Sequence, residues 1–216
     1  EVLELTIDPL LADGDSVVAL DARVTICHVP ASQRKYDQLA IAPYPRELVE
    51  QVQLADGTSV VVRPIRPEDA QLEQDFVRDL SLESRRFRFM HALSRLSDEM
   101  LVRFTQLDYD RELGLIATQK LESREIPLGI ARYIRDGDEL GCEFAVVVAD
   151  AWQKRGVASQ LMRALIGAAR SRRLAYMHGD VLADNSRMLR WMEKLGFNVE
   201  VHPDDAMLRL ATLPLQ

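Results

Sequence analysis

The chain has 216 residues, of which 47% are apolar and 28% charged, so it can bury a substantial core and is neither fully disordered nor fibrous. Its 27 basic and 34 acidic side chains give a net charge of −7, which excludes a whole-molecule positive field that would attract nucleic acid or an anionic membrane surface. We therefore expect no nucleic acid and no membrane among its partners.

Two features of the sequence concern the cell compartment. Cys27 and Cys142 lie far apart without metal-type spacing, which is typical of a reducing compartment rather than of a disulfide scaffold. No apolar run approaches the roughly 18 residues that span a bilayer, and the N-terminus lacks the order of a secretion signal. We expect a cytoplasmic protein, and we interpret Glu1 as the start of a fragment of a longer chain.

The N-terminal part has a β pattern followed by linker composition. Alternation of apolar and polar residues predicts a strand over 2–7 and one or two more over 16–26. Three prolines interrupt a polar stretch from Pro30 to Pro45, which favours a linker. We therefore expect a short β segment over 1–28, a linker over 29–48 and a domain over 49–216.

Helices and strands fill the rest of the chain. The Asp56–Gly57 turn joins two apolar runs into a predicted hairpin, and Pro67 opens a helix whose expected buried face is Leu72, Phe76, Val77 and Leu80. Helical spacing or capping signals predict further helices over 83–91, 97–107, 154–173 and 184–195. A period of two predicts strands over 113–121, 127–134, 140–149, 175–182, 198–202 and 206–213. The order predicts an α+β domain.

The segment after the strand over 140–149 is the most informative for chemistry. It reads Gln153, Lys154, Arg155, Gly156, Val157, Ala158, Ser159 and leads into a long helix. Backbone N–H groups at a helix N-terminus bind anions, and Gly156 and Ala158 leave room for a ligand. The segment thus predicts a pyrophosphate-binding loop, with the alternative that Gly156 merely starts the helix.

A second cluster turns this loop into a more specific signature. The Q-x-x-G-x-A pattern from Gln153 to Ala158, followed by Asn185 and by Lys194, Gly196 and Phe197, resembles the acyl-CoA signature of the GNAT superfamily of N-acetyltransferases. The likeness covers about residues 49–213. It implies the GNAT fold, in which helices flank a central, mostly antiparallel mixed sheet.

The resemblance implies acetyl-CoA as cosubstrate and no metal. It implies that the residues from Gln153 to Ser159 surround the pyrophosphate, that the backbone of Val146, Val147 and Val148 pairs with the pantetheine arm, and that Asn185 contacts the pantetheine or phosphate region. For Asn185 the alternative is that it only caps the following helix. The four histidines show no metal-ligand spacing.

Glu143 is the candidate general base. A lysine amine with a pKa of about 10.4 is about 3.4 units too protonated for attack at pH 7, a cost of about 4.6 kcal/mol. Glu143 is a carboxylate in an apolar strand, on the opposite face from Cys142. We expect burial to raise its pKa so that it accepts the amine proton, directly or through a water, while a strand N–H near Val146 polarises the thioester. A salt-bridged structural Glu is the alternative.

Two other positions bear on the mechanism. Many GNAT enzymes have a Tyr two residues before the Lys of the K-x-G-F pattern, and Met192 stands there, which leaves the general acid unassigned. A CoA thiol of pKa about 8.5 gives a thiolate that can leave without one. Cys142 as an acyl-carrying nucleophile is the alternative to direct attack, but no His lies beside it in the sequence.

Two further resemblances concern the acceptor. The segment Glu4–Asp13 looks like the end of the ATP-grasp region of ADP-forming acyl-CoA synthetases, with Thr6 at the acidic metal-ligand position and Asp8 in place of Asn. Such a degenerate region before a GNAT domain is the architecture of Pat-type bacterial protein lysine acetyltransferases, which the segments Leu82–Phe89 and Glu143–Val148 also resemble. The likeness implies a protein substrate, an acyl-CoA synthetase. Arg85, Arg86 and Arg88 then either help to dock it or form a solvated helix face.

The sequence therefore predicts an acetyl-CoA-dependent N-acetyltransferase that modifies protein lysines in a ternary complex. The alternatives are a small-molecule amine acetyltransferase and a non-catalytic acyl-CoA sensor. No motif indicates the oligomeric state.

Overall fold

The computed structural model describes residues 2–13, 16–26, 42–91, 93–122, 124–138 and 140–216. The chain divides into two compact units, Glu1–Ala40 and Ile41–Gln216. Cys27 and most of the expected linker over 29–48 lie outside the described residues.

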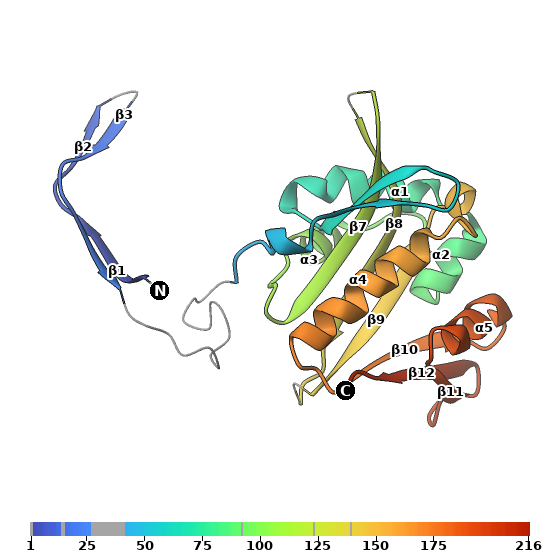
Figure 1. Cartoon of the computed structure of the whole chain (residues 1–216). Helices are drawn as coiled ribbons and strands as arrows, with labels where there is room; N and C mark the ends of the chain where they lie inside the picture. Colours follow the sequence, from blue (N-terminus) through green and yellow to red (C-terminus); the bar gives the residue numbers. More distant parts are fainter. Residues whose placement is uncertain (1, 14–15, 27–41, 92, 123, 139) are drawn as a thin grey trace. The chain divides into compact units, whose positions relative to one another are not determined.

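The first unit contains two short antiparallel ribbons. β1 (Val2–Ile7) pairs with β4 (Ala22–Ile26), and β2 (Leu10–Asp13) pairs with β3 (Ser16–Ala19) (Figure 1). Sequence patterning missed β2, because Leu10-Leu11-Ala12 lacks the alternation that marks a half-buried strand. All residues of β3 and β4 are exposed. The origin of this segment as a synthetase remnant stays a prediction.

An eight-stranded sheet in the order β11-β12-β10-β9-β8-β7-β6-β5 forms the centre of the second unit. Its neighbouring strands are antiparallel except β9 and β10, which are parallel. The mostly antiparallel mixed sheet that the resemblance implied is therefore confirmed. The strands are β5 (Glu50–Gln53), β6 (Ser59–Pro64), β7 (Glu112–Leu121), β8 (Arg124–Arg135), β9 (Gly141–Val148), β10 (Tyr176–Leu182), β11 (Asn198–Val201) and β12 (Leu208–Pro214).

Helices flank this sheet on both faces. α1 (Ala70–Asp79), α2 (Leu82–Phe89) and α3 (Asp98–Thr105) lie on one side, and α4 (Val157–Ser171) crosses the other (Figure 1). α5 (Ser186–Lys194) packs on β11 and β12. Among the described residues, no helix combines the length and apolar character needed to cross a membrane.

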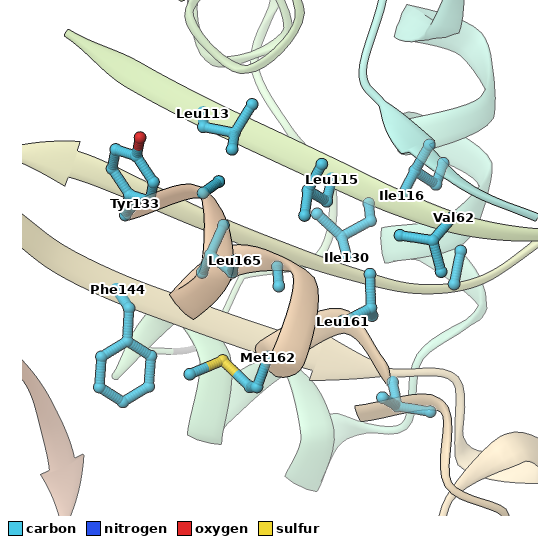
Figure 2. Packing of buried hydrophobic residues seen from close by; sticks show 14 of the residues in the cluster. Val62, Leu113, Leu115, Ile116, Ile130, Tyr133, Phe144, Leu161, Met162 and Leu165 are labelled. Carbon is cyan, nitrogen blue, oxygen red and sulfur yellow. The ribbon is translucent and has the colours of Figure 1, made fainter. Parts of the chain in front are cut away.

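The stripe of buried residues on α4 fixes the position of its N-terminus. Val157, Leu161, Met162, Leu165, Ala168 and Ala169 are buried at the spacing of one helix face. Figure 2 shows Leu161, Met162 and Leu165 among side chains of the sheet such as Tyr133 and Phe144. This packing fixes the first turn of α4 at the end of the loop that follows β9.

The buried face of α1 differs in two respects from the expected one: Leu72 is only half-buried, and an acidic residue is buried. Phe76 and Val77 are buried as predicted, but so is Glu73, whose side chain is 1% exposed. The carboxylate pairs with Arg132 of β8, whose guanidinium carbon lies 4.2 Å from the centre of the Phe104 ring. Helical spacing alone missed Glu73 because its partner comes from a distant strand.

The parallel pairing of β9 with β10 is short. Only Gly141, Cys142 and Glu143 pair with residues Tyr176, Met177 and His178. Beyond them, the Phe144 ring lies against the backbone of Gly179, where an added Cβ would stand 2.7 Å from a ring carbon. We refer to the point after the Glu143–His178 pair, where the two strands stop pairing, as the strand fork.

Leu161→Ala tests the packing of α4. We expect it to lower the free energy of unfolding by about 2–5 kcal/mol, because it leaves a cavity beneath a fully buried side chain. Leu121→Ala, on a side chain that is 57% exposed, is the matched control and should change it by less than about 0.5 kcal/mol. Urea denaturation measures both, and equal effects would contradict this account.

Candidate active site

A cavity of about 790 Å³ opens at the strand fork. Its walls come from α2, β9, the loop into α4, the end of β10 and the start of α5. The predicted site residues that line it are Glu143, Val146, Val147, Val148, Gln153, Lys154, Gly156, Ala158, Ser159 and Asn185. The structure thus brings together residues from three separate parts of the sequence.

The first turn of α4 faces this cavity with open backbone amides. Gly156 precedes the helix with φ of +95°, and its carbonyl accepts from the N–H of Gln160. Within the described part of the chain, no side chain caps this terminus. The N–H groups that precede the first intrahelical bond, together with the helix dipole, make this end of the cavity suited to a phosphate.

Two of the predicted residues, Arg155 and Val157, do not line the cavity. The Arg155 guanidinium lies 3.9 Å from the Trp152 ring centre and binds the carboxylate of Asp56 at 2.6 Å. Hydrogen bonds from Thr58 and then from Arg155 lower the pKa of Asp56 below its usual range. Val157 is buried in the core under α4. These side chains anchor the loop, so only their main chain remains for a ligand.

The Gln153 side chain is held inside a network that sequence reasoning missed. Its amide nitrogen donates to the Ser84 hydroxyl at 3.1 Å, and its oxygen accepts from Arg187. Asp150 accepts from the Ser81 N–H at 2.8 Å and from the Ser84 hydroxyl at 2.7 Å. The only sequence signal was the N-cap position of Ser81, whose hydroxyl accepts from the Ser84 N–H.

The charge of Asp150 strengthens this network at neutral pH. Partial burial alone would raise the pKa of Asp150, but the hydrogen bonds from Ser81 and Ser84 outweigh it and lower the pKa below its usual range. The carboxylate is therefore ionised at neutral pH and ties the start of α2 to the end of β9.

Asn185 combines the two roles considered for it. Its Oδ1 atom accepts from the N–H of Met188 at 3.1 Å, which caps α5, and the residue also lines the cavity. The neighbouring Asp184 pairs with Arg86 of α2 at 2.8 Å. α2 and α5 are therefore connected beside the cavity.

The three arginines of α2 do not form one solvated face. Arg86 is committed to Asp184, and Arg85 donates to the Ser94 carbonyl at 3.0 Å. Arg88 is half-buried and lines the cavity. Burial and the nearby Arg132 lower the pKa of Arg88 to about 10 against the opposing charges of Glu73 and Glu143, so it stays cationic at pH 7.

Glu143 lies on the cavity wall at the strand fork. Its side chain is exposed and Cys142 beside it is buried, so their placement on opposite faces is confirmed. The expected burial of Glu143 is wrong: the cavity is open here, and the apolar neighbours in sequence alternate onto the other face. The carboxylate is therefore accessible to water and to an incoming acceptor.

The two other positions that bear on the mechanism, Met192 and Cys142, lie in the core. Met192, at the position where many GNAT enzymes have Tyr, is fully buried. Burial, with the nearby Asp136 charge, raises the pKa of the Cys142 thiol to about 12. The geometry therefore disfavours Cys142 as an acyl-carrying nucleophile.

Comparison with known proteins identifies the family. The model of the acetyltransferase (GNAT) family matches residues 75–197, which include the strand fork, the loop and α5. The chain belongs to the GNAT acetyltransferase family. GNAT acetyltransferases use acetyl-CoA, and the open amides of α4 beside the cavity suit its pyrophosphate.

Three relatives show how far the likeness of this GNAT protein extends. An acetyltransferase of Pseudomonas aeruginosa is 34% identical over 153 residues, which are 71% of this chain and 82% of the relative. The acetyltransferase Pat of Mycolicibacterium smegmatis is 30% identical over 186 residues, or 82% of this chain but 53% of Pat. The crystal structure of the GNAT domain of S. lividans PAT superposes with a TM-score of 0.73 at 28% identity, covering 80% of this chain and 99% of that domain.

Gly156→Ala tests the phosphate end of the cavity. A residue with a Cβ destabilises the left-handed conformation of position 156 by about 1–2 kcal/mol, which disfavours the loop geometry that presents the backbone amides. We therefore expect acetyl-CoA to bind about tenfold more weakly. Gly167→Ala, at an exposed site within α4 where an added Cβ meets no atom within 4 Å, is the matched control. It should leave binding unchanged and raise stability by up to about 1 kcal/mol. Calorimetric titration measures the affinity, and unchanged binding by Gly156→Ala would contradict the assignment.

Proposed function

We propose that this protein transfers the acetyl group of acetyl-CoA to the side-chain amine of protein lysines, with Glu143 as the general base. The observation that carries the proposal is the position of Glu143 on the cavity wall, at the fork where β9 leaves β10. The amides of the loop into α4 line the same cavity. One cavity therefore offers a carboxylate for the acceptor and an anion site for the cosubstrate.

The remaining predicted residues fit the binding of acetyl-CoA along β9. In the proposal, the loop from Gln153 to Ser159 holds the pyrophosphate through its backbone, and the backbone of Val146–Val148 pairs with the pantetheine arm. Support comes from the end of the pairing with β10 at Glu143, after which that edge of β9 faces the cavity. Asn185 contributes from the start of α5, where it lines the cavity.

The proposed chemistry is direct attack in a ternary complex. Glu143 takes a proton from the lysine ammonium, directly or through a water, and the free amine attacks the thioester carbon. The C–N bond forms, the C–S bond breaks, and the second nitrogen proton passes to the departing thiolate or to solvent. A strand N–H near Val146 polarises the carbonyl oxygen. The thiol pKa of about 8.5 makes the thiolate a good leaving group without an acid in the place of Met192.

The relatives support a protein as acceptor. Pat and the GNAT domain of PAT align with most of this chain, and the segments Leu82–Phe89 and Glu143–Val148 resemble Pat-type protein lysine acetyltransferases. Besides Asp184, which is paired with Arg86, three acidic residues line the cavity and suit a cationic lysine: Glu83, Glu143 and Asp180. In the proposal the partner is an acyl-CoA synthetase.

A labelling experiment tests the acceptor. The protein is incubated with radiolabelled acetyl-CoA and a purified acyl-CoA synthetase, and the modified residue is mapped by mass spectrometry. Label on one synthetase lysine supports the proposal. Label on free polyamines but not on protein would instead favour a small-molecule acetyltransferase, and binding of acetyl-CoA without any transfer would favour an acyl-CoA sensor.

Glu143→Gln tests the general base. We expect it to lower kcat by about 10²–10⁴-fold, because the amide cannot accept the amine proton, while the affinity for acetyl-CoA stays unchanged. Glu193→Gln, at an exposed glutamate of α5 that does not line the cavity, is the matched control and should keep full activity. Steady-state kinetics and calorimetric titration give the two readouts. A Glu143→Gln enzyme with normal kcat would overturn this role.

A further inference from the structure

A second carboxylate, Asp180, lines the cavity from the other strand of the fork. Glu143 and His178 are Cα partners across β9 and β10, so their side chains share one face of the sheet. Asp180 lies two residues beyond His178 on the same strand and therefore on the same face. Both Glu143 and Asp180 line the cavity. The two carboxylates thus occupy separate strands on either side of the fork.

Asp180 has an unusually weak internal counter-charge. Its side chain is 31% exposed, and the basic side chain beside it is His202, whose Nε2 atom lies 3.7 Å from Oδ1, beyond hydrogen-bond distance. The Nδ1 atom of His202 accepts from the N–H of Asp204, so a neutral ring carries its proton on Nε2, toward Asp180. Within the described ranges, no arginine or lysine forms an ion pair with Asp180.

The other carboxylates of the cavity are placed differently. Asp184 follows the end of β10 and is neutralised by Arg86 at 2.8 Å. Glu83 belongs to α2 and not to either strand of the fork. Glu143 has the cationic Arg88 close enough for their charges to interact. Asp180 is therefore the carboxylate at the fork that can still form an ion pair with an external cation.

We infer that Asp180 binds the ammonium group of the acceptor and selects cationic amines. This inference rests on the proposed function and adds a specificity-determining residue to it. Glu143 loses its charge when it takes the proton, whereas Asp180 keeps its charge and holds the acceptor. The attacking nitrogen also becomes positive again when it bonds to the thioester carbon, and a neighbouring carboxylate stabilises that charge.

Two model acceptors separate charge recognition from general damage to the site. One is Nα-acetyl-lysinamide, whose amine is a cation at pH 7, and the other is Nα-acetyl-p-aminophenylalaninamide, whose aromatic amine is neutral. We expect Asp180→Asn to raise KM for the lysine acceptor about tenfold. KM for the aromatic amine and for acetyl-CoA should stay unchanged.

Asp204→Asn is the matched control. It removes one negative charge from an exposed residue near His202 that does not line the cavity, and all constants should stay as in the wild type. Equal effects of Asp180→Asn on both acceptors, or none on the lysine acceptor, would overturn the inference. An unchanged melting temperature of Asp180→Asn shows that the fold is intact.

Equilibrium binding gives a readout that needs no turnover. Nα-acetyl-lysinamide is titrated into the CoA-loaded wild type and the Asp180→Asn variant, and the variant should bind about tenfold more weakly. Equal binding contradicts the role of Asp180. A wild type that binds the lysine acceptor and acetyl-CoA but acetylates no lysine contradicts the proposed function and leaves the role of Asp180 in binding supported.

Discussion

The short parallel pairing between β9 and β10 is the constraint on which the site depends. The two strands share only three residue pairs before they separate, and the aromatic ring of Phe144 lies against the bare backbone of Gly179 just past the last pair. The separation exposes one edge of β9, and the cavity forms there. The sheet therefore provides both a frame and an opening between two strands, and Glu143 lies on the wall of that opening.

Charge is distributed along this cavity in a way that suits two different ligands. The end near the loop carries the α4 amides together with Lys154 and Arg187, which favour an anionic cosubstrate. The fork carries Glu143 and Asp180, which favour a cationic amine. Side chains around the loop are occupied with holding it: Arg155 binds Asp56, and Gln153 joins Ser84 and Arg187. The ligand site is consequently formed in large part by backbone that these contacts keep in place.

Family membership and substrate identity rest on different parts of the molecule. The family model covers β7 to β10, the loop and α5, the elements that in our proposal bind the cosubstrate. In our proposal the acceptor meets the rim of the cavity, which the end of α2, the end of β10 and the start of α5 form. The chain spans about half the length of Pat, so the likeness to that relative concerns the transferase part and leaves the acceptor as a proposal.

The sequence by itself determined the helices and strands of the second unit, their order and the loop that precedes α4, because hydrophobic periodicity, caps and the Gly156 turn are local signals. It missed β2 in the first unit. It also identified Glu143, since an acidic residue interrupts an apolar strand. Only the tertiary structure decided that Arg155 and Val157 support the loop from behind, and that Glu143 is exposed. The pairing of Glu73 with Arg132 and the presence of Glu143 and Asp180 in one cavity likewise depend on contacts between residues far apart in the chain. Such contacts leave no periodic pattern in the sequence. The side chains are brought together by long-range packing and by the separation of two strands, and neighbouring residues in the sequence do not encode either.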